Sequence, residues 1–188
     1  FRRTRPTEPQ ATPPPALLEA PPAVSSTLTI DRSSYVDPNG FVYHEDGRIL
    51  RAVYTPVADF YRELLTNGTL ARLQSEHGLV ATRARDRNAP SPDVGLVLEH
   101  EKVEPLSYCV EWPPSMLREA ALCTLRLCRA LLELGATLQD GYPWNVLFRG
   151  TEPVFVDLTS IVPADSHLPW PAYAQFQSFF LRPLTLAR

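Results

Sequence analysis

The sequence predicts an α+β protein in which a β-rich first half precedes a helical second half. Two turns, Asp37-Pro38-Asn39-Gly40 and Glu45-Asp46-Gly47-Arg48, separate short runs rich in β-branched and aromatic residues, a pattern typical of an antiparallel meander. After Pro113 the apolar residues instead recur every three or four positions, which is the spacing of a helix. Because strands and helices are segregated along the chain, we expect two lobes.

The individual elements follow from the same patterns and from the residues that interrupt them. Pro56 suits the first turn of a helix, and Ser115 is a suitable N-cap for the longest helix, which ends near Gly135. The predicted strands are 28–30, 41–43, 49–54, 79–83, 94–103, 106–112, 146–148 and 153–157, and the predicted helices begin near 56, 70, 115 and 170. The order is therefore a β-meander, helices, strands, a long helix, a hairpin and a final helix.

Length and composition predict one globular body with a tail. The chain has 188 residues, of which 44% are hydrophobic and 21% charged, enough for one domain with a core. Residues 1–24 contain seven prolines, which remove backbone donors, so we expect a disordered linker there, with a polyproline ligand as the alternative. Residues 25–112 form the expected β-rich N-lobe and residues 113–188 a fragment of a helical C-lobe. Because the chain starts at Phe1 rather than Met, we expect a piece of a longer protein.

Charge, hydropathy and cysteine content argue against several classes of function. The net charge of −3 gives no electrostatic basis for binding nucleic acid. No run of about 18 apolar residues is present, so no membrane span is expected. The three cysteines are odd in number and lack metal-ligand spacing, which favours reduced thiols in the cytoplasm. A catalytic thiol is the alternative, although apolar neighbours raise the pKa of a thiol.

Three polar residues stand at the ends of apolar segments in the second half. Asp140 precedes Asn145 by five residues, and Asp157 follows the apolar run Val154-Phe155-Val156. Phosphoryl transfer needs a carboxylate that orients or deprotonates the acceptor hydroxyl, together with oxygen ligands for Mg²⁺. The pattern therefore predicts Asp140 as the catalytic base and Asn145 and Asp157 as metal ligands. The simpler alternative is a turn residue, a loop cap and a strand-end cap.

The stretch Asp140-x-x-Pro143-x-Asn145 resembles the catalytic loop of protein kinases, and more closely its form in aminoglycoside- and choline-kinase-like phosphotransferases. Asp157 falls where those families carry the Asp of the D-F-G triplet, although Leu158-Thr159 stands in place of Phe-Gly. The resemblance implies a two-lobed protein-kinase-like fold with a truncated C-terminal lobe. It also implies ATP and Mg²⁺ as cofactors of this chain.

The first half of the chain departs from the kinase pattern. Kinases carry a lysine on the third strand that pairs with a helical glutamate, whereas the third predicted strand here offers Arg51 and the next helix offers Asp59 or Glu63. By resemblance, Arg51 is the phosphate clamp and Glu63 belongs with it to the cofactor site. Arginine is not interchangeable with lysine, and Asp37-Pro38-Asn39-Gly40 replaces the glycine-rich loop with a single glycine. An ordinary surface strand residue is the alternative for Arg51.

A wider set of motifs runs from about residue 28 to residue 188. Its segments are Asp37-Pro38-x-Gly40-Phe41-Val42, Gly47-Arg48-x-x-Arg51, Glu111-Trp112, Asp140-x-x-x-x-Asn145-Val146-x-Phe148-Arg149-Gly150, Pro153-Val154-Phe155-Val156-Asp157 and Trp170-Pro171-Ala172-Tyr173. Together they resemble the N-terminal portion of bacterial proteins described as class I S-adenosylmethionine-dependent methyltransferases, in which a kinase-like segment precedes the methyltransferase domain. No glycine-rich strand-to-helix turn for the methyl donor is present in this sequence. The resemblance therefore implies that S-adenosylmethionine binds only in a domain beyond this chain.

Two interpretations of the function remain open at this point. The chain is either a kinase-like module that positions a small-molecule substrate or the attached methyltransferase domain, or an active ATP- and Mg²⁺-dependent phosphotransferase for a small hydroxyl or sugar acceptor. The absent lysine, the absent glycine-rich loop and the altered D-F-G triplet favour the module. The presence of Asp140, Asn145 and Asp157 favours the phosphotransferase.

Overall fold

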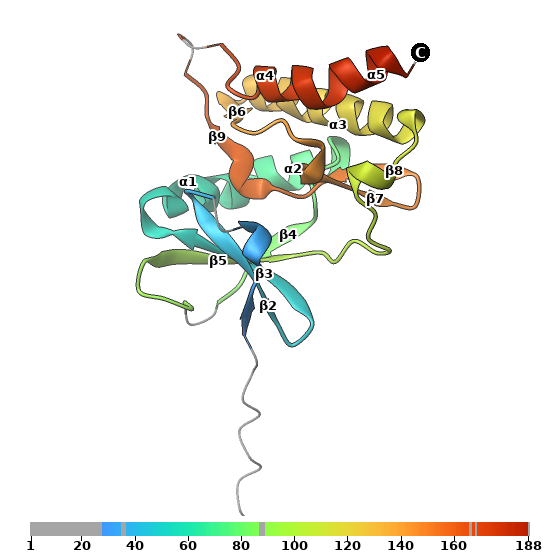
Figure 1. The fold of residues 1–188 in the computed structure, drawn as a ribbon. Coiled ribbons are helices and arrows are strands. Elements are labelled where there is room, and N and C mark those ends of the chain that lie inside the picture. The colour runs from blue at the N-terminus through green and yellow to red at the C-terminus, as the bar shows by residue number, and fades with distance from the viewer. Residues whose placement is uncertain (1–27, 35–36, 87–88, 166, 168, 188) are drawn as a thin grey trace, which may run out of the picture.

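The computed structural model describes residues 28–34, 37–86, 89–165, 167 and 169–187. The proline-rich segment 1–24, expected to be a disordered linker, lies outside these residues. Within the described part, the chain forms a five-stranded sheet, two small strand pairs and several helices (Figure 1).

An antiparallel sheet makes up most of the first half. Its strands lie in the order β1-β2-β3-β5-β4, and they are β1 (Thr29–Ile30), β2 (Gly40–Glu45), β3 (Arg48–Tyr54), β4 (Thr82–Ala84) and β5 (Val94–His100). The β2–β3 hairpin turns at Asp46 and Gly47, whose φ angles of 50° and 75° are the left-handed values that a two-residue hairpin turn favours. Because β3 is paired on both sides, Arg51 lies at the centre of the sheet.

Two helices follow β3 and pack near the sheet. They are α1 (Thr55–Thr66) and α2 (Thr69–Glu76), and α1 contacts both β3 and β5. The buried residues of α1 are Ala58, Tyr61 and Leu64, which recur every three positions and so form the face turned toward the core. Pro56 occupies the first turn of α1, as predicted, where a backbone N–H has no partner within the helix.

The second half contains the longest helix, two short strand pairs and a terminal helical segment. Its elements are α3 (Pro114–Leu132), β6 (Ala136–Leu138), β7 (Val146–Arg149), β8 (Glu152–Phe155), β9 (Ile161–Pro163), α4 (Tyr173–Phe176) and α5 (Arg182–Leu186), with a π-helical turn at Gln177–Leu181 between the last two helices. β7 pairs with β8 and β6 pairs with β9, both in antiparallel fashion. The hairpin and the final helical segment lie where the sequence predicts them.

The predicted strand 79–83 is shifted to Thr82–Ala84, and three further local features differ from the sequence-based expectations. Residues 106–112 do not form a strand, because Glu111 Oε2 accepts the Tyr108 N–H at 2.9 Å and closes a 3₁₀ turn. Ser115 is not the N-cap of α3, which begins at Pro114, since proline is well suited to the first helical position. The sequence does not predict the β6–β9 pair, because strands of three residues are too short to show an alternating pattern.

One main hydrophobic core joins the two halves of the chain. It includes Val53 and Leu98 from the sheet together with Leu127, Phe155 and Phe180 from the second half. Figure 1 shows α1 and α2 between the sheet and the layer formed by α3 and the α4–α5 segment. A mixed α/β chain with an antiparallel sheet is therefore confirmed, and the two-lobed kinase-like arrangement stays a prediction.

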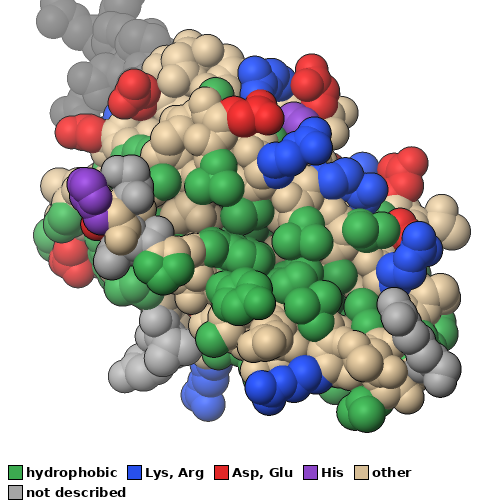
Figure 2. Space-filling model, turned by 90° about the horizontal axis from the view of Figure 1, so that it is seen from above, with side chains coloured by type: hydrophobic (Ala, Val, Ile, Leu, Met, Phe, Trp, Pro, Cys, Tyr) green, Lys and Arg blue, Asp and Glu red, His purple; other side chains and the backbone are tan. Residues whose placement is uncertain are grey.

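Apolar side chains are exposed on the face formed by α3 and the α4–α5 segment. Figure 2 views this face and shows apolar side chains gathered in its middle, with charged side chains around them. The large exposed residues contributed by these elements are Leu125, Leu132, Tyr173, Phe179, Leu181 and Leu186. Contiguous apolar surface of this kind is typical of a contact region.

Candidate functional site

A cleft of about 760 Å³ lies between the sheet and the β7–β8 hairpin. One wall is formed by residues of β2, β3 and β5, and the opposite wall by residues next to β7 and β8. The volume is within the range of pockets that hold nucleotides and other small molecules. Asp140, Asn145 and Asp157 all line this cleft, so the structure brings the three motif residues to one site.

The β7–β8 hairpin explains why Asn145 and Asp157 lie together. Asn145 immediately precedes β7, and Asp157 follows β8 by two residues. The antiparallel register pairs Val146 with Phe155, and the next residue, Val156, donates its N–H to the Asn145 carbonyl at 2.8 Å. Residues far apart in the sequence thus meet at the open end of one hairpin.

A second strand pair brings Asp140 to the same corner. β6 pairs with β9, and the pairing continues beyond the strands because Gln139 donates its N–H to the Ser160 carbonyl at 2.8 Å. The Asp140 N–H then donates to Ser160 Oγ at 3.1 Å. Because Ser160 follows Asp157 by three residues, these bonds place the Asp140 loop beside the segment that carries Asp157.

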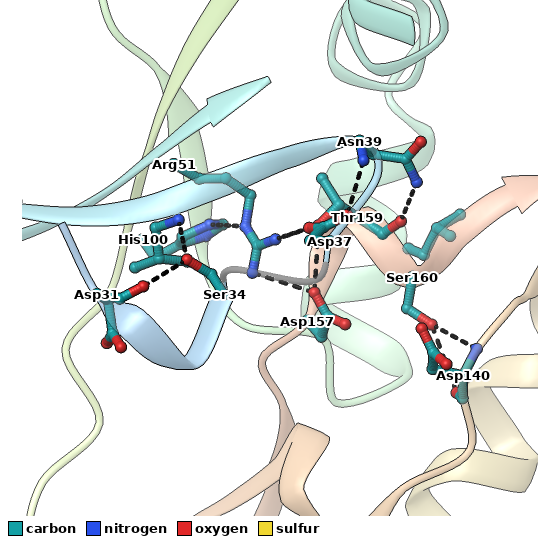
Figure 3. Close-up of polar contacts among 12 residues, drawn as sticks. Asp31, Ser34, Asp37, Asn39, Arg51, His100, Asp140, Asp157, Thr159 and Ser160 are labelled. Carbon is teal, nitrogen blue, oxygen red and sulfur yellow. Dashed lines mark hydrogen bonds and ion pairs between the residues drawn. The ribbon is translucent and has the colours of Figure 1, made fainter. Parts of the chain in front are cut away.

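Arg51 on β3 is held in the cleft by two carboxylates, as Figure 3 shows. Its Nη1 donates to Asp37 Oδ2 at 2.9 Å, and its Nη2 donates to Asp157 Oδ1 at 3.1 Å. Nη1 also donates to the hydroxyl of Thr159, which contacts both carboxylates. The Arg51 side chain is only 7% exposed, so its charge is compensated almost entirely within the protein.

Buried His100 fixes the third side of the Arg51 guanidinium. Arg51 Nε always carries a proton, so it donates to His100 Nε2, at 3.3 Å. The proton of the neutral ring is therefore on Nδ1, which donates to Thr82 Oγ1 at 2.8 Å, and Thr82 donates in turn to the Val80 carbonyl. Burial, and then the charge of Arg51, lower the pKa of His100 to about 3. His100 is thus a neutral acceptor that orients Arg51.

The two carboxylates share one guanidinium, and this affects Asp157. Burial raises the pKa of Asp157 above its ordinary value of 3.8. The charge of Arg51 opposes this rise, whereas the charge of Asp37 adds to it. With both acids ionised, the group of Asp37, Arg51 and Asp157 carries a net negative charge.

Thr159 ties the two halves of the chain together at the back of the cleft. Its side chain contacts Arg51 and Asp37, and its carbonyl accepts the side-chain amide of Asn39 at 3.0 Å. The residue is fully buried. A glycine here, as in the D-F-G triplet of kinases, has no side chain to make the first two contacts. The departure from the motif therefore creates part of the network around Arg51.

Gln175 of α4 holds Asp140 and the neighbouring Gly141 in place. Its Nε2 donates to Asp140 Oδ1 at 3.2 Å, and its Oε1 accepts the Gly141 N–H at 2.8 Å. Across the described residues, no cation forms an ion pair with Asp140, and the side-chain amide of Asn145 has no hydrogen-bond partner. Both groups line the cleft and are available to a ligand.

The lining of the cleft is acidic. Its carboxylates are those of Asp31, Asp37, Glu101, Asp140 and Asp157, and its cationic side chains are those of Arg51 and Lys102. Both cations are already paired, since Lys102 Nζ lies 2.6 Å from Glu104 Oε1. In the described part of the cleft the buried cation is compensated by carboxylates and the exposed Lys102 stands in a surface ion pair, so a ligand that offers hydrogen-bond donors or positive charge is favoured.

Glu63, expected to act with Arg51 in the cofactor site, lies elsewhere. It is exposed on α1 and does not line the cleft. The helical period explains this, because Ala58, Tyr61 and Leu64 occupy the buried face and Glu63 falls beside it. Asp59, the other expected partner, pairs with Arg62 instead. The predicted pairing of Arg51 with an acid of α1 is therefore wrong, and Asp37 and Asp157 take that place.

The donor set fits Mg²⁺ only in part. The described residues contain no group of three or more His, Cys, Asp or Glu side chains that could hold a metal ion. The predicted ligands are one carboxylate and one amide, Asp157 and Asn145, and one oxygen of Asp157 is bonded to Arg51. Mg²⁺ binds such sparse sites together with substrate phosphates and water. Metal binding by these two residues stays a prediction.

The surroundings of the three cysteines disfavour a nucleophilic thiol. Cys109, Cys123 and Cys128 are free thiols. Burial raises the pKa of each, that of Cys123 to about 11, so the thiolate is disfavoured. This result disfavours the catalytic-thiol alternative, and the cytoplasmic location stays a prediction. Separately, none of the described helices combines the length and the apolar composition needed to cross a membrane.

Four residues of the site were not predicted as functional from the sequence. They are Asp37, His100, Thr159 and Gln175. The sequence could have indicated Asp37 and Thr159, because each stands where the resembled kinase motifs have a different residue. No sequence pattern could have indicated His100 or Gln175, since their partners are 49 and 35 residues away in the sequence.

The fold and the cleft together define an α+β protein with an acidic cleft of small-molecule size, lined by Asp140, Asn145 and Asp157. No family model matches the chain. Nodulation protein NoeA of Rhizobium meliloti (strain 1021) is 32% identical over 160 residues, which cover 81% of this chain and 32% of NoeA. The chain thus spans about a third of the length of the curated relative that it matches.

Among solved structures, the crystal structure of WbdD is similar to this chain. The TM-score is 0.46 at 19% sequence identity, and the match covers 83% of this chain and 37% of the other. A TM-score at this level does not establish a shared fold. The relationship that the comparisons do show is the sequence similarity to NoeA, and it covers one segment of that longer protein.

Proposed function

We propose that this chain is a kinase-like module that binds a small-molecule substrate in its cleft and positions it, without transferring phosphate, for an S-adenosylmethionine-dependent methyltransferase domain in the same longer protein. The observation that carries the proposal is the state of Arg51. Its guanidinium is bonded to Asp37, Asp157 and His100, so the residue expected to clamp phosphate is occupied by the protein itself.

The arrangement of the site supports the kinase-like part of the proposal. In protein kinases the basic residue lies on the third strand, and the metal ligands are an Asn of the catalytic loop and the Asp of the next triplet. Here Arg51 lies on β3, and Asn145 and Asp157 flank one hairpin with Asp140 nearby. The proposed roles differ because Arg51, the basic residue at this point of the sheet, is neutralised by Asp37 and Asp157.

The methyltransferase part rests on the motif resemblance and on chain length. The chain matches about a third of NoeA, and the resembled family joins a kinase-like segment to a methyltransferase domain. This sequence lacks the glycine-rich turn that a methyl-donor site requires. S-adenosylmethionine would then bind to the attached domain, which is also the partner of this module.

A specific observation favours a second candidate, an ATP- and Mg²⁺-dependent phosphotransferase. Asp140, Asn145 and Asp157 line one cleft, and Asp140 is oriented by Gln175 and forms no ion pair with any cation among the described residues. In that case Asp140 is the base toward a small hydroxyl or sugar acceptor, Asn145 and Asp157 hold Mg²⁺ with the phosphates, and Arg51 must leave Asp37 to contact phosphate.

The melting temperature in the presence of Mg·ATP separates the two candidates. A ligand that binds the native state raises the melting temperature by mass action. We expect no rise with millimolar Mg·ATP, no rise with S-adenosylmethionine, and no release of ADP. A rise with Mg·ATP that Asp157→Asn removes would instead establish the phosphotransferase. In that outcome Asp140→Asn should preserve the rise and abolish turnover, because a base acts on the acceptor.

A further inference from the structure

Asp37 is held in place independently of Arg51. It precedes β2, and its Oδ1 accepts the backbone N–H of Asn39 at 2.9 Å, which is an Asx-turn. Its Oδ2 is thereby directed to Nη1 of Arg51, at 2.9 Å, and also accepts the hydroxyl of Thr159. The carboxylate, only 14% exposed, is thus preset by the local backbone to cover one edge of the guanidinium.

We propose that Asp37 is a specificity-determining residue of the cleft, whose carboxylate occupies the edge of Arg51 to which an anionic ligand would bind and so excludes phosphate-bearing molecules. The inference rests on the proposed function, because it gives the reason why this cleft does not take a nucleotide. It also restricts the substrate class to neutral or cationic small molecules.

The geometry of the guanidinium supports this role. Arginine binds phosphate and carboxylate through pairs of N–H groups at one edge. On Arg51, Nε donates a hydrogen bond to His100, Nη2 donates to Asp157, and Nη1 donates to Asp37 and Thr159. Removing the Asp37 charge frees one N–H of Nη1 for an anion, whereas the N–H groups that contact Thr159, Asp157 and His100 keep their partners.

A purely structural role explains the second carboxylate less well. One carboxylate is enough to neutralise one guanidinium, and Asp157 already supplies it at 3.1 Å. Adding Asp37, whose Oδ2 lies 2.9 Å from Arg51 Nη1, leaves the group with excess negative charge when both acids are ionised. A buried ionic group of this kind is weak evidence for stability, but a second carboxylate on the same guanidinium is an effective barrier to anions.

Binding of inorganic pyrophosphate without metal tests the proposal. Wild-type protein should show no saturable binding at millimolar pyrophosphate by calorimetry or thermal shift. Asp37→Asn keeps the Asx-turn acceptor and removes the charge, so it should bind pyrophosphate at least ~10-fold more tightly, since like-charge juxtaposition is strongly unfavourable. Adding Arg51→Gln to Asp37→Asn should abolish the gain, because the gained site is the guanidinium.

Asp31→Asn is the matched control for charge. Asp31 also lines the cleft and loses the same charge on substitution, but its described ion pair is with His44, at 3.3 Å, rather than with Arg51. An equal gain in Asp31→Asn would show a general electrostatic effect and would overturn the proposal. Asp37→Ser provides a second variant in case Asp37→Asn does not fold, because serine can also accept the Asn39 N–H.

The outcomes separate this inference from the proposed function. If neither Asp37 variant binds pyrophosphate more tightly than wild type, the inference is overturned, while a wild type that ignores Mg·ATP still supports the module. If wild type itself binds pyrophosphate as tightly as Asp37→Asn, the inference is overturned as well. A wild type that binds and turns over Mg·ATP instead contradicts the proposed function.

Discussion

The two walls of the cleft handle charge in opposite ways. On the sheet wall, Arg51 is bonded to protein atoms through Nε, Nη1 and Nη2. On the hairpin wall, Asp140 is held by the neutral amide of Gln175, and within the described residues the side chain of Asn145 makes no hydrogen bond. The hydrogen-bond donors of Arg51 on the sheet wall are therefore paired within the protein, whereas the polar groups on the hairpin wall are open to a ligand. The order of motif residues along a chain therefore does not by itself decide whether the basic residue beside them is free to contact a ligand.

Burial accounts for this difference. The side chains of Arg51 and Asp37 are 7% and 14% exposed, so their charges must be compensated by protein groups. Asp140 stands on a loop, Asn145 ends the short 3₁₀ helix Pro143–Asn145, and both are only partly buried, so that water or a ligand can complete their hydrogen bonds. Changes on the sheet wall should therefore affect stability more than changes on the hairpin wall.

Arg51→Met should have the largest effect on stability. It leaves the carboxylates of Asp37 and Asp157 close together and without a counter-charge, and loss of one partner from a buried ion pair costs about 3–5 kcal/mol. Urea unfolding at neutral pH measures the change. Arg83→Met is the matched control, because Arg83 pairs with Glu99 at the surface and little change is expected. Equal losses in the two variants would refute the role of Arg51 as a buried counter-charge.

His100 should make stability depend on pH. Its folded pKa of about 3 lies below the ordinary value of 6.5, so between these values the unfolded chain binds a proton that the folded chain does not. Stability should therefore decrease as the pH falls from 6.5 toward 3, by about 1.4 kcal/mol for each pH unit. His100→Gln keeps an acceptor for Arg51 without titrating and should flatten this slope.

The comparison of wild type with His100→Gln removes the contributions of other groups. Asp157 acts in the opposite sense, because its raised pKa means that the folded chain binds the proton more tightly and stability falls as the pH rises above 3.8. This contribution is common to both proteins and cancels in the difference. If the free energy of unfolding changes with pH in the same way for the two proteins, His100 is excluded as the cause of the pH dependence.

Thr159→Val should have a smaller effect on the same wall. It preserves shape but removes the hydroxyl that contacts Arg51 and Asp37. Loss of a buried hydrogen bond that leaves its partners unsatisfied costs about 1–3 kcal/mol. Thermal or urea unfolding measures the loss, and Thr159→Ser should restore most of it because the hydroxyl is retained. A serine variant as unstable as the valine variant would point to packing rather than hydrogen bonding.

Gln175→Ala should have the smallest effect on global stability, of about 1 kcal/mol. One of its two hydrogen bonds is to a neutral backbone group and the other is to the carboxylate of Asp140, and both are partly exposed. The local effect should be clear, since the Gly141 N–H loses its acceptor. Hydrogen exchange at the Gly141 amide should therefore speed up. Gln175→Glu keeps that acceptor but repels Asp140, so the Gly141 amide should remain protected. If the hydrogen-exchange rate of the Gly141 amide is unchanged in Gln175→Ala, Gln175 does not position this loop.

Much of the local structure could be predicted from the sequence. The β7–β8 hairpin and the long helix α3 lie where strand alternation and helical spacing indicate. That hairpin is sufficient to bring Asn145 next to Asp157, because its two ends meet. The β6–β9 pair, which adds Asp140 to the corner, could not be predicted, since three-residue strands carry no recognisable period.

The partners of Arg51 were the part that sequence analysis missed. The sequence pattern indicated an acid on the next helix, but the apolar period of α1 turns Glu63 away from the cleft. The actual partners come from a turn 14 residues earlier and from the segment after β8. Partners so far apart leave no periodic signal, and only the packing of the sheet against the hairpin brings them together.

By itself the sequence determined an antiparallel sheet followed by helices, and the set of polar residues on the β7–β8 hairpin and its loop. Only the tertiary structure decided whether the basic residue on β3 is free to bind a ligand. That outcome depends on burial and on distances between segments more than a hundred residues apart, such as the contact of Asp37 with Thr159. Propensity and spacing act over a few residues, whereas the pairing of a buried charge is set by whichever groups the folded core places beside it.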